Sequence, residues 1–133
     1  MTTLLTGSSR KTELPNRIAI SRMIMQLFTQ WAINTQEQLD LLGLARNNRT
    51  TLVSYRNGRP ISENRDSLER AGHLLAIHKN LRLLFSDDKR LESQWLKTRN
   101  RAFDGLTPIE LVGEFGFVGL LMVRGYLDRM CGY

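Results

Sequence analysis

The chain has 133 residues, of which 41% are hydrophobic and 24% charged, and this is the composition of an ordinary globular protein with one modest core or two small ones. The single cysteine, Cys131, excludes an internal disulfide bond and fits a reducing compartment. The longest apolar run, FGFVGLLMV, has nine residues. A membrane span needs about 20, and the first residues lack the apolar region of a secretion signal, so we expect a cytoplasmic protein with no membrane partner.

The net charge of +6 is unevenly distributed along the chain. Residues 1–61 carry eight basic and three acidic groups, residues 62–101 carry nine and six, and residues 102–133 carry two and four. A basic N-terminal half can attract phosphate backbones or an anionic membrane, whereas the near-neutral C-terminal half would repel neither protein nor solvent. The two halves therefore indicate two different tasks.

Helical periodicity defines the predicted elements of the N-terminal half. A flexible arm is expected over residues 1–14, followed by an amphipathic helix over 15–33. Thr35 with Gln38 three residues later forms a capping box, which predicts a short helix that stops at Gly43.

Two further helices follow the break ARNNR. Asn47 or Asn48 can cap a helix over 48–57, and Ser62 can cap a long helix whose apolar stripe continues to Phe85.

The C-terminal half also favours helices. The stretch LESQWLKTR offers a helical turn or two, and residues 116–130 form a last apolar helix. Between them, Thr107 and Glu110 form a capping box with Pro108 at the first helical position, opening a short helix that ends near Gly113. No segment alternates convincingly with period two, so the sequence predicts an all-α fold.

The helices predicted over 35–42 and 48–57, with a tight break around Gly43, have the lengths and order of a helix-turn-helix, whose second helix enters the DNA major groove. In that helix Leu52 and Val53 are expected to be buried. Hydroxyl and guanidinium groups suit phosphate oxygens and base edges. The candidate DNA-binding residues are Arg49, Thr50, Thr51, Ser54, Tyr55, Arg56 and Arg59. A helix-loop-helix with a solvated Arg-rich face that binds no nucleic acid would give the same pattern.

The C-terminal half carries a combination of motifs that is far more specific than a helix-turn-helix pattern. The motifs are LRLLF at 81–85, Trp95-Leu96, Asn100, AFDG at 102–105, TPIELV at 107–112 and GLLMVRGYLD at 119–128. This combination resembles the toxin-binding domain of the Xre/MbcA/ParS-type antitoxins. The likeness covers about residues 75–133, and residues 15–75 lie where that family places an Xre-like helix-turn-helix domain. The resemblance thus implies a DNA-binding domain at 15–75 and a small helical toxin-binding and dimerisation domain at 76–133.

The resemblance also implies a function. Family members are non-catalytic antitoxins that block the active-site cleft of a RES-type toxin, which consumes NAD or uses it for ADP-ribosylation. The complex binds the promoter of its own operon, and the antitoxin commonly forms a homodimer. By matching positions, the toxin-facing surface would be built or presented by Trp95, Asn100, Phe103, Asp104, Gly105, Thr107 and Pro108, with Arg124, Tyr126 and Leu127 on the matching final helix.

The last helix is apolar on more than one side. Val118, Leu121 and Met122 lie on one side, and Leu120, Val123 and Leu127 on another. So short a chain cannot easily cover both, which predicts a partner surface, although both sides could pack within this domain. The tail that ends at Tyr133 could reach into a toxin cleft or could be a frayed end.

The groups that catalysis requires are missing from the sequence pattern. His73 and His78 are five residues apart and off one helical face, and Glu110 and Glu114 are accounted for by the opening turn of a helix. We expect no catalysis, no metal ion and no cofactor. Two alternatives to a DNA-binding antitoxin remain: a solitary transcriptional repressor whose C-terminal half only dimerises, and an antitoxin whose basic helices form a protein surface.

Overall fold

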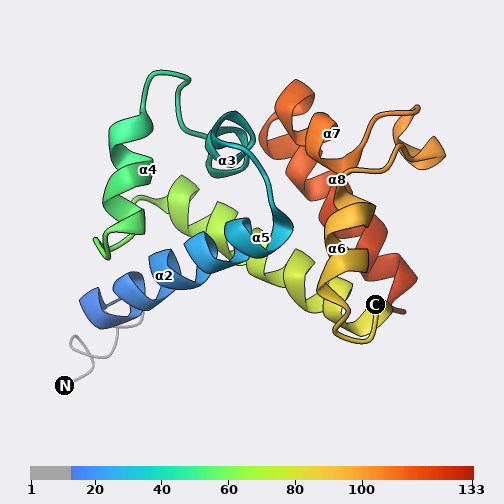
Figure 1. Cartoon of the computed structure of the whole chain (residues 1–133), viewed down its shortest axis with the longest axis horizontal. Helices are drawn as coiled ribbons and strands as arrows, with labels where there is room; N and C mark the ends of the chain where they lie inside the picture. The colour runs from blue at the N-terminus through green and yellow to red at the C-terminus, as the bar shows by residue number, and fades with distance from the viewer. Residues whose placement is uncertain (1–12) are drawn as a thin grey trace, which may run out of the picture.

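The computed structural model describes residues 13–133, so the predicted arm over 1–14 lies outside it except for its last two residues. Within this range the chain forms seven α-helices and one 3-10 turn, and no strand. The elements are α2 (Leu14–Trp31), α3 (Thr35–Leu42), α4 (Arg49–Arg56), α5 (Arg65–Leu84), α6 (Lys89–Leu96), η1 (Arg101–Phe103), α7 (Pro108–Phe115) and α8 (Phe117–Met130) (Figure 1). The all-α fold class is confirmed.

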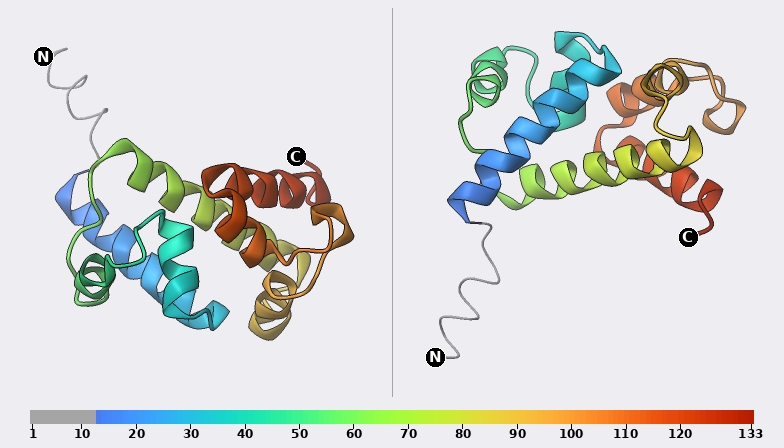
Figure 2. Two further views of the ribbon diagram at one scale, coloured as in Figure 1. Left: turned by 90° about the horizontal axis from the view of Figure 1, so that it is seen from above. Right: turned by 60° about the horizontal axis from the view of Figure 1, so that its bottom comes forward.

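The longest helix, α5, serves both halves of the molecule. Helices α2, α3 and α4 gather towards one end of it and α6, α7 and α8 towards the other (Figure 2). The two groups also touch directly, since α2 packs on α6 and α3 packs on α7. The predicted domain boundary between residues 75 and 76 therefore falls inside a continuous helix.

One hydrophobic core runs through both groups. It includes Phe28 and Trp31 of α2, Leu74 and Leu81 of α5, and Leu120 of α8, all almost fully buried. A shared core of this kind gives cooperative stability to a chain too short to build two independent cores at full strength.

Two helix starts differ from the sequence prediction. The capping box of α3 is made by Asn34 and Glu37, not by Thr35 and Gln38, because the extended backbone that an N-cap requires lies one residue earlier. The side chain of Gln38 is buried instead, and its side-chain amide donates to the carbonyl of Ile33.

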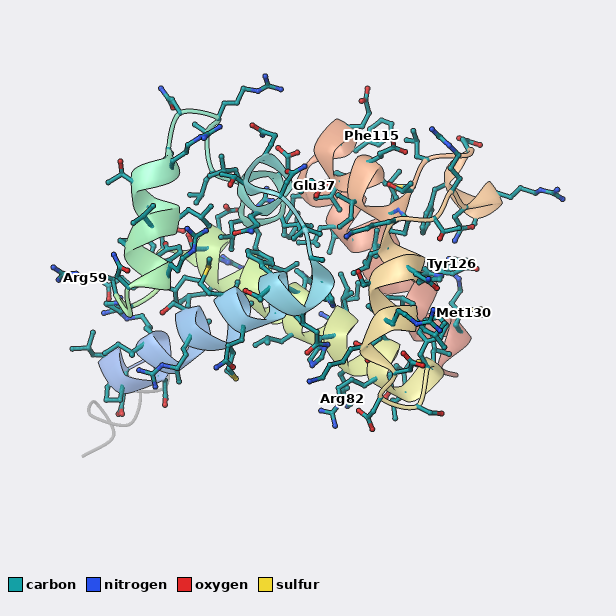
Figure 3. The ribbon with its side chains drawn as sticks, in the orientation of Figure 1. Glu37, Arg59, Arg82, Phe115, Tyr126 and Met130 are labelled. Carbon is teal, nitrogen blue, oxygen red and sulfur yellow. The ribbon has the colours of Figure 1, made fainter. Side chains whose placement is uncertain are left out.

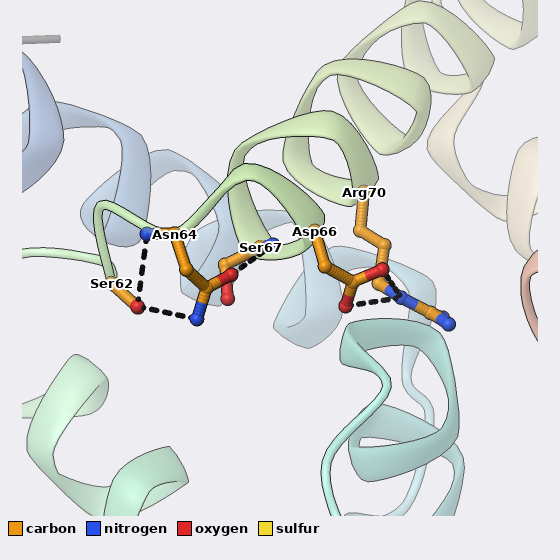
Figure 4. A network of polar contacts seen from close by, with 5 residues as sticks. All are labelled: Ser62, Asn64, Asp66, Ser67 and Arg70. Atoms are coloured by element: carbon orange, nitrogen blue, oxygen red, sulfur yellow. Dashed lines mark hydrogen bonds and ion pairs between the residues drawn. The ribbon is translucent and has the colours of Figure 1, made fainter. Parts of the chain in front are cut away.

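The start of α5 is likewise shifted from the prediction. Asn64, not Ser62, is its cap, and its side-chain oxygen accepts a hydrogen bond from the amide of Ser67 at 2.8 Å. Ser62 supports the cap from outside the helix, because its hydroxyl accepts from the Asn64 side chain at 2.8 Å (Figure 4).

The other caps follow the prediction. Asn48 caps α4, and Thr107 and Glu110 form both hydrogen bonds of the capping box that opens α7. Helix α7 continues to Phe115, two residues beyond the predicted end, and Gly116 with a φ of 61° makes the sharp turn into α8.

A buried carboxyl group lies where α2, α5 and α6 meet. Glu92 is fully buried, and its Oε1 accepts from the side chain of Gln30 at 3.3 Å and lies 3.6 Å from His78 Nδ1. Burial raises the pKa of Glu92, and burial followed by the nearby Arg82 charge lowers the pKa of His78. His78 therefore provides no full positive charge at neutral pH to offset the buried carboxylate.

The close packing of α7 on α8 gives a first prediction. A Cβ atom at Gly119 would overlap the backbone carbonyl of Leu111, whereas one at Gly125 would meet only the end of the Arg129 side chain at 3.7 Å. Gly119→Ala should lower the free energy of unfolding by about 1–3 kcal/mol. Gly125→Ala, in the same helix, should raise it by about 0.5–1 kcal/mol. Urea denaturation of both variants tests this, and equal effects would contradict the packing.

Glu92 gives a second prediction, on pH. Because its folded-state pKa is raised above the ordinary 4.5, the ionised group destabilises the fold at pH values above the raised pKa, and this penalty disappears as the pH falls below 4.5. Glu92→Gln should therefore be more stable than the wild type at pH 8, with a difference that shrinks towards pH 4. Urea denaturation as a function of pH measures this.

Glu63→Gln is the control, because it removes the same charge from an exposed position. A stability profile of Glu92→Gln that runs parallel to that of Glu63→Gln would show that burial of Glu92 has no energetic consequence.

Candidate functional site

The loop between α6 and α7 is closed by its own hydrogen bonds. The backbone amide of Asn100 donates to Leu106 and that of Gly105 donates to Asn100, both at 3.0 Å. The Asn100 side chain accepts from the amide of Ala102 at 2.9 Å. Asp104 and Gly105 adopt left-handed conformations, with φ of 54° and 84°. Within this closed loop Asp104 is exposed to solvent.

Three aromatic rings support the loop from below. Tyr126 of α8 stacks on Trp95 of α6, with ring centres 6.0 Å apart, and meets the edge of Phe103 at 5.3 Å. Phe103 is only 4% exposed. Trp95, Phe103 and Tyr126 thus hold α6, the loop and α8 together. Their main role is to position the surface residues and not to be exposed on the surface themselves.

An apolar surface adjoins the loop. It consists of Phe115, Val118, Leu121 and Met122, which are 53%, 60%, 41% and 43% exposed and which we call the α7–α8 apolar surface. The opposite side of α8, with Leu120, Val123 and Leu127, is buried. The two apolar sides predicted for this helix are confirmed, and only one of them packs against other parts of residues 13–133.

A groove of about 580 Å³ connects the loop with this surface. It is lined by Ala102, Phe103, Asp104, Leu106, Leu111, Glu114, Phe115, Val118 and Met122. Two carboxylates, Asp104 and Glu114, stand beside an otherwise apolar floor, so the groove suits a partner with an apolar projection and a basic rim.

The remaining residues predicted for this surface have structural contacts. Thr107 is the cap of α7, and Pro108 and Leu127 are buried. Arg124 faces α5, where its Nη1 lies 2.8 Å from His73 Nδ1. Tyr133 is 66% exposed and its ring lies 5.8 Å from the Lys79 ammonium group. The structure therefore brings Phe103 and Asp104 to the groove. It leaves Arg124 on the contact between α8 and α5, Leu127 in the core and Tyr133 at the chain end.

The contact between Arg124 and His73 is electrostatically consistent. Burial and the Arg124 charge both lower the pKa of His73, so its ring is neutral at pH 7 and can accept a hydrogen bond from the guanidinium group. Arg124 also pairs with Asp128 at 3.6 Å, and Asp128 accepts from Asn80 at 2.8 Å. These bonds fix α8 against α5.

The second candidate surface lies on α4, and α3 lies between α4 and Phe115 of α7 (Figure 3). Helices α3 and α4 are joined by residues 43–48, a connection longer than the three or four residues of a simple helix-turn-helix. Helix α4 packs on α2 and α3 through Leu52 and Tyr55. The remainder of its surface is open to solvent or half-buried.

The predicted DNA-binding residues divide into two groups. Arg49, Thr50, Arg56 and Arg59 are exposed. Thr51 and Ser54 are half-buried, and their hydroxyls donate to Asn48 Oδ1 and to the Thr51 carbonyl. Tyr55 is 6% exposed, and its hydroxyl accepts from the amide of Ser62 at 3.2 Å. The exposed group forms the outward face, and Tyr55 belongs to the core that holds it.

The expected burial of Val53 is wrong. Its side chain is 44% exposed, because the next residue after the buried Leu52 lies about 100° around the helix and α4 is covered on one side only. An exposed aliphatic residue among arginines was missed by the sequence analysis, since Leu-Val reads as a pair of core residues.

The C-terminal part of the chain has a family match. Residues 80–132 match the model described as the antitoxin Xre/MbcA/ParS C-terminal toxin-binding domain. The match contains the loop, the aromatic support and the α7–α8 apolar surface. The resemblance inferred from the motifs is confirmed, and the family supports the role of an antitoxin with a toxin partner and a regulatory rather than an enzymatic function.

The whole chain also has a relative. It is 29% identical over 133 residues to the "Uncharacterized protein y4oB" of Sinorhizobium fredii, and the alignment covers 99% of both chains.

Within residues 13–133, no group of three or more His, Cys, Asp and Glu side chains is arranged to hold a metal ion. In the same part of the chain, no helix has the length and apolar character that crossing a membrane requires.

Proposed function

We propose that this chain is the antitoxin of a type II toxin–antitoxin system. It neutralises a RES-type, NAD-consuming toxin in the cytoplasm by covering the toxin's active site, and it represses its own operon through α3 and α4. The observation that carries the proposal is the uncovered α7–α8 apolar surface beside Asp104, inside the segment that belongs to the toxin-binding domain family.

The composition of the surface fits this partner. Phe115, Val118 and Met122 supply apolar area of the kind that dominates protein interfaces once it is desolvated. Asp104 and Glu114 add negative charge at the edge of the groove. A cleft that binds NAD must attract a pyrophosphate, which Arg and Lys side chains bind best, so carboxylates are suitable groups for covering it.

The DNA-binding part of the proposal depends on the outward face of α4. Arg49 and Arg56 stand near the two ends of this short helix and Arg59 follows it, all exposed. The net charge of the first 61 residues is positive, which favours association with a phosphate backbone.

One alternative uses the same surface. In a solitary repressor, the α7–α8 apolar surface would pair with a second copy of the chain, because an exposed patch of this kind is equally suited to a homodimer. A dimer within the toxin complex is compatible with the main proposal, so binding of a toxin distinguishes the two.

The toxin interface is tested by a matched pair of methionines. Met122 lies on the α7–α8 apolar surface and is 43% exposed, and Met23 lies on α2 and is 44% exposed. When the chain is co-expressed with the product of the neighbouring gene, Met122→Asp should weaken the complex at least tenfold, because it places a charge in an apolar contact. Growth and cellular NAD should then fall.

Met23→Asp should behave as the wild type in the same pull-down and growth assays. If both variants keep the complex while folded, the toxin binds elsewhere on the chain. If the wild type itself neither forms a complex nor rescues growth, the solitary repressor is the better description.

The DNA surface is tested through the salt dependence of binding. With DNA from upstream of the gene as probe, Arg56→Ala should weaken binding and lower the slope of log K against log salt by about one unit, as expected for the loss of one phosphate contact. Arg90→Ala, which removes an exposed charge from α6, should leave the slope unchanged. Equal effects of the two variants would indicate that only bulk charge matters.

A further inference from the structure

The outward face of α4 has an aliphatic residue at its centre. Val53 is 44% exposed, and the residues one turn away from it on both sides, Arg49, Thr50, Arg56 and Asn57, are all exposed as well. Val53 is therefore the point at which the helix would touch a surface laid against this face.

Val53 does not belong to the hydrophobic core of the described residues. Its side chain is not among the partly buried apolar groups that pack against the core. A β-branched residue also lowers helix propensity at an exposed position relative to Ala, Lys or Gln. Among residues 13–133 the Val53 side chain is therefore outside the core, and its methyl groups are accessible to a partner laid against this face.

The chemistry of the major groove limits what that contact can be. The base edges there present hydrogen-bond donors and acceptors, and the one apolar group among the four standard bases is the C5-methyl of thymine. A valine side chain placed against guanine, adenine or cytosine would desolvate polar atoms and give them no partner.

We propose that Val53 is a specificity-determining residue that reads the methyl group of a thymine at the centre of the DNA site. The flanking residues hold the helix in position: Arg49 and Arg56 bind phosphates, and Thr50 contacts the neighbouring base edge. This inference rests on the proposed binding of DNA by α4 and adds the base that the helix selects.

The test uses duplexes selected from a random-sequence library by the full-length chain. Each thymine of the selected duplex is then replaced, one at a time, by uracil, which removes the C5-methyl group and nothing else. At one position of the site, uracil should weaken binding of the wild type roughly fourfold, as expected for one methyl group removed from an apolar contact.

The variant Val53→Ala should lose the response to uracil at that position while keeping it elsewhere. The substitution is at an exposed helical position and favours the helix, so the variant folds. Arg49→Ala is the control: it should weaken binding to every duplex alike and keep the wild-type response to uracil.

Two failures are distinguishable. If the chain enriches no duplex over the starting library, the proposed DNA binding by α4 is wrong. If a duplex is enriched but the wild type and Val53→Ala respond identically to every uracil, the chain binds DNA and Val53 does not read thymine.

Discussion

The whole structure depends on burying α5 on both sides at once. The helix is 20 residues long, and its buried residues, among them Leu74, Ile77 and Leu81, contribute to one core together with residues of α2 and α8. A chain of 133 residues has little apolar area to spare, and a shared helix lets each half use the packing of the other. The two candidate surfaces therefore stand on helices that share one core.

Arg70 is a buried charged residue of α5 that takes part in the same packing. Arg70 is 9% exposed, and its guanidinium group pairs with Asp66 at 3.1 Å (Figure 4). The same group lies over the ring of Phe117, 5.4 Å from the ring centre. It also lies against Gly43, where a Cβ atom would come within 2.5 Å of the guanidinium carbon. Gly43 suits this position through its left-handed φ of 69° at the end of α3, and a larger residue there would displace the end of the Arg70 side chain. One side chain thus connects the end of α3, the start of α5 and the start of α8.

The two surfaces differ in the physics that suits them to partners. The outward face of α4 consists of exposed arginines, a threonine and a single valine. This composition favours a charged, hydrated partner that makes one apolar contact, with the valine. The α7–α8 apolar surface has four large apolar side chains and two carboxylates at the groove beside it, which favours a protein partner. The family match covers the α7–α8 apolar surface and leaves the outward face of α4 to be tested by experiment.

The sequence by itself determined the features that depend on residues close together in the chain. Helical periodicity predicted the helices. The capping box predicted at Thr107 forms both of its hydrogen bonds. The motifs around Trp95 and Phe103 indicated the antitoxin family. Cap positions such as Asn34 and Asn64 were missed by one or two residues, because several polar side chains in each stretch could serve and only the backbone conformation selects one.

The tertiary structure decided which side of each helix is covered. Tyr55 and Val53 both lie on α4, and only the packing of α2 and α3 against one side makes the first a core residue and the second a surface residue. The same holds for α8, whose sequence is apolar on two sides and whose partner α5 reaches only one. Periodicity gives the angle between two side chains around a helix, but which of those angles faces a neighbour is fixed by contacts between residues far apart in the chain.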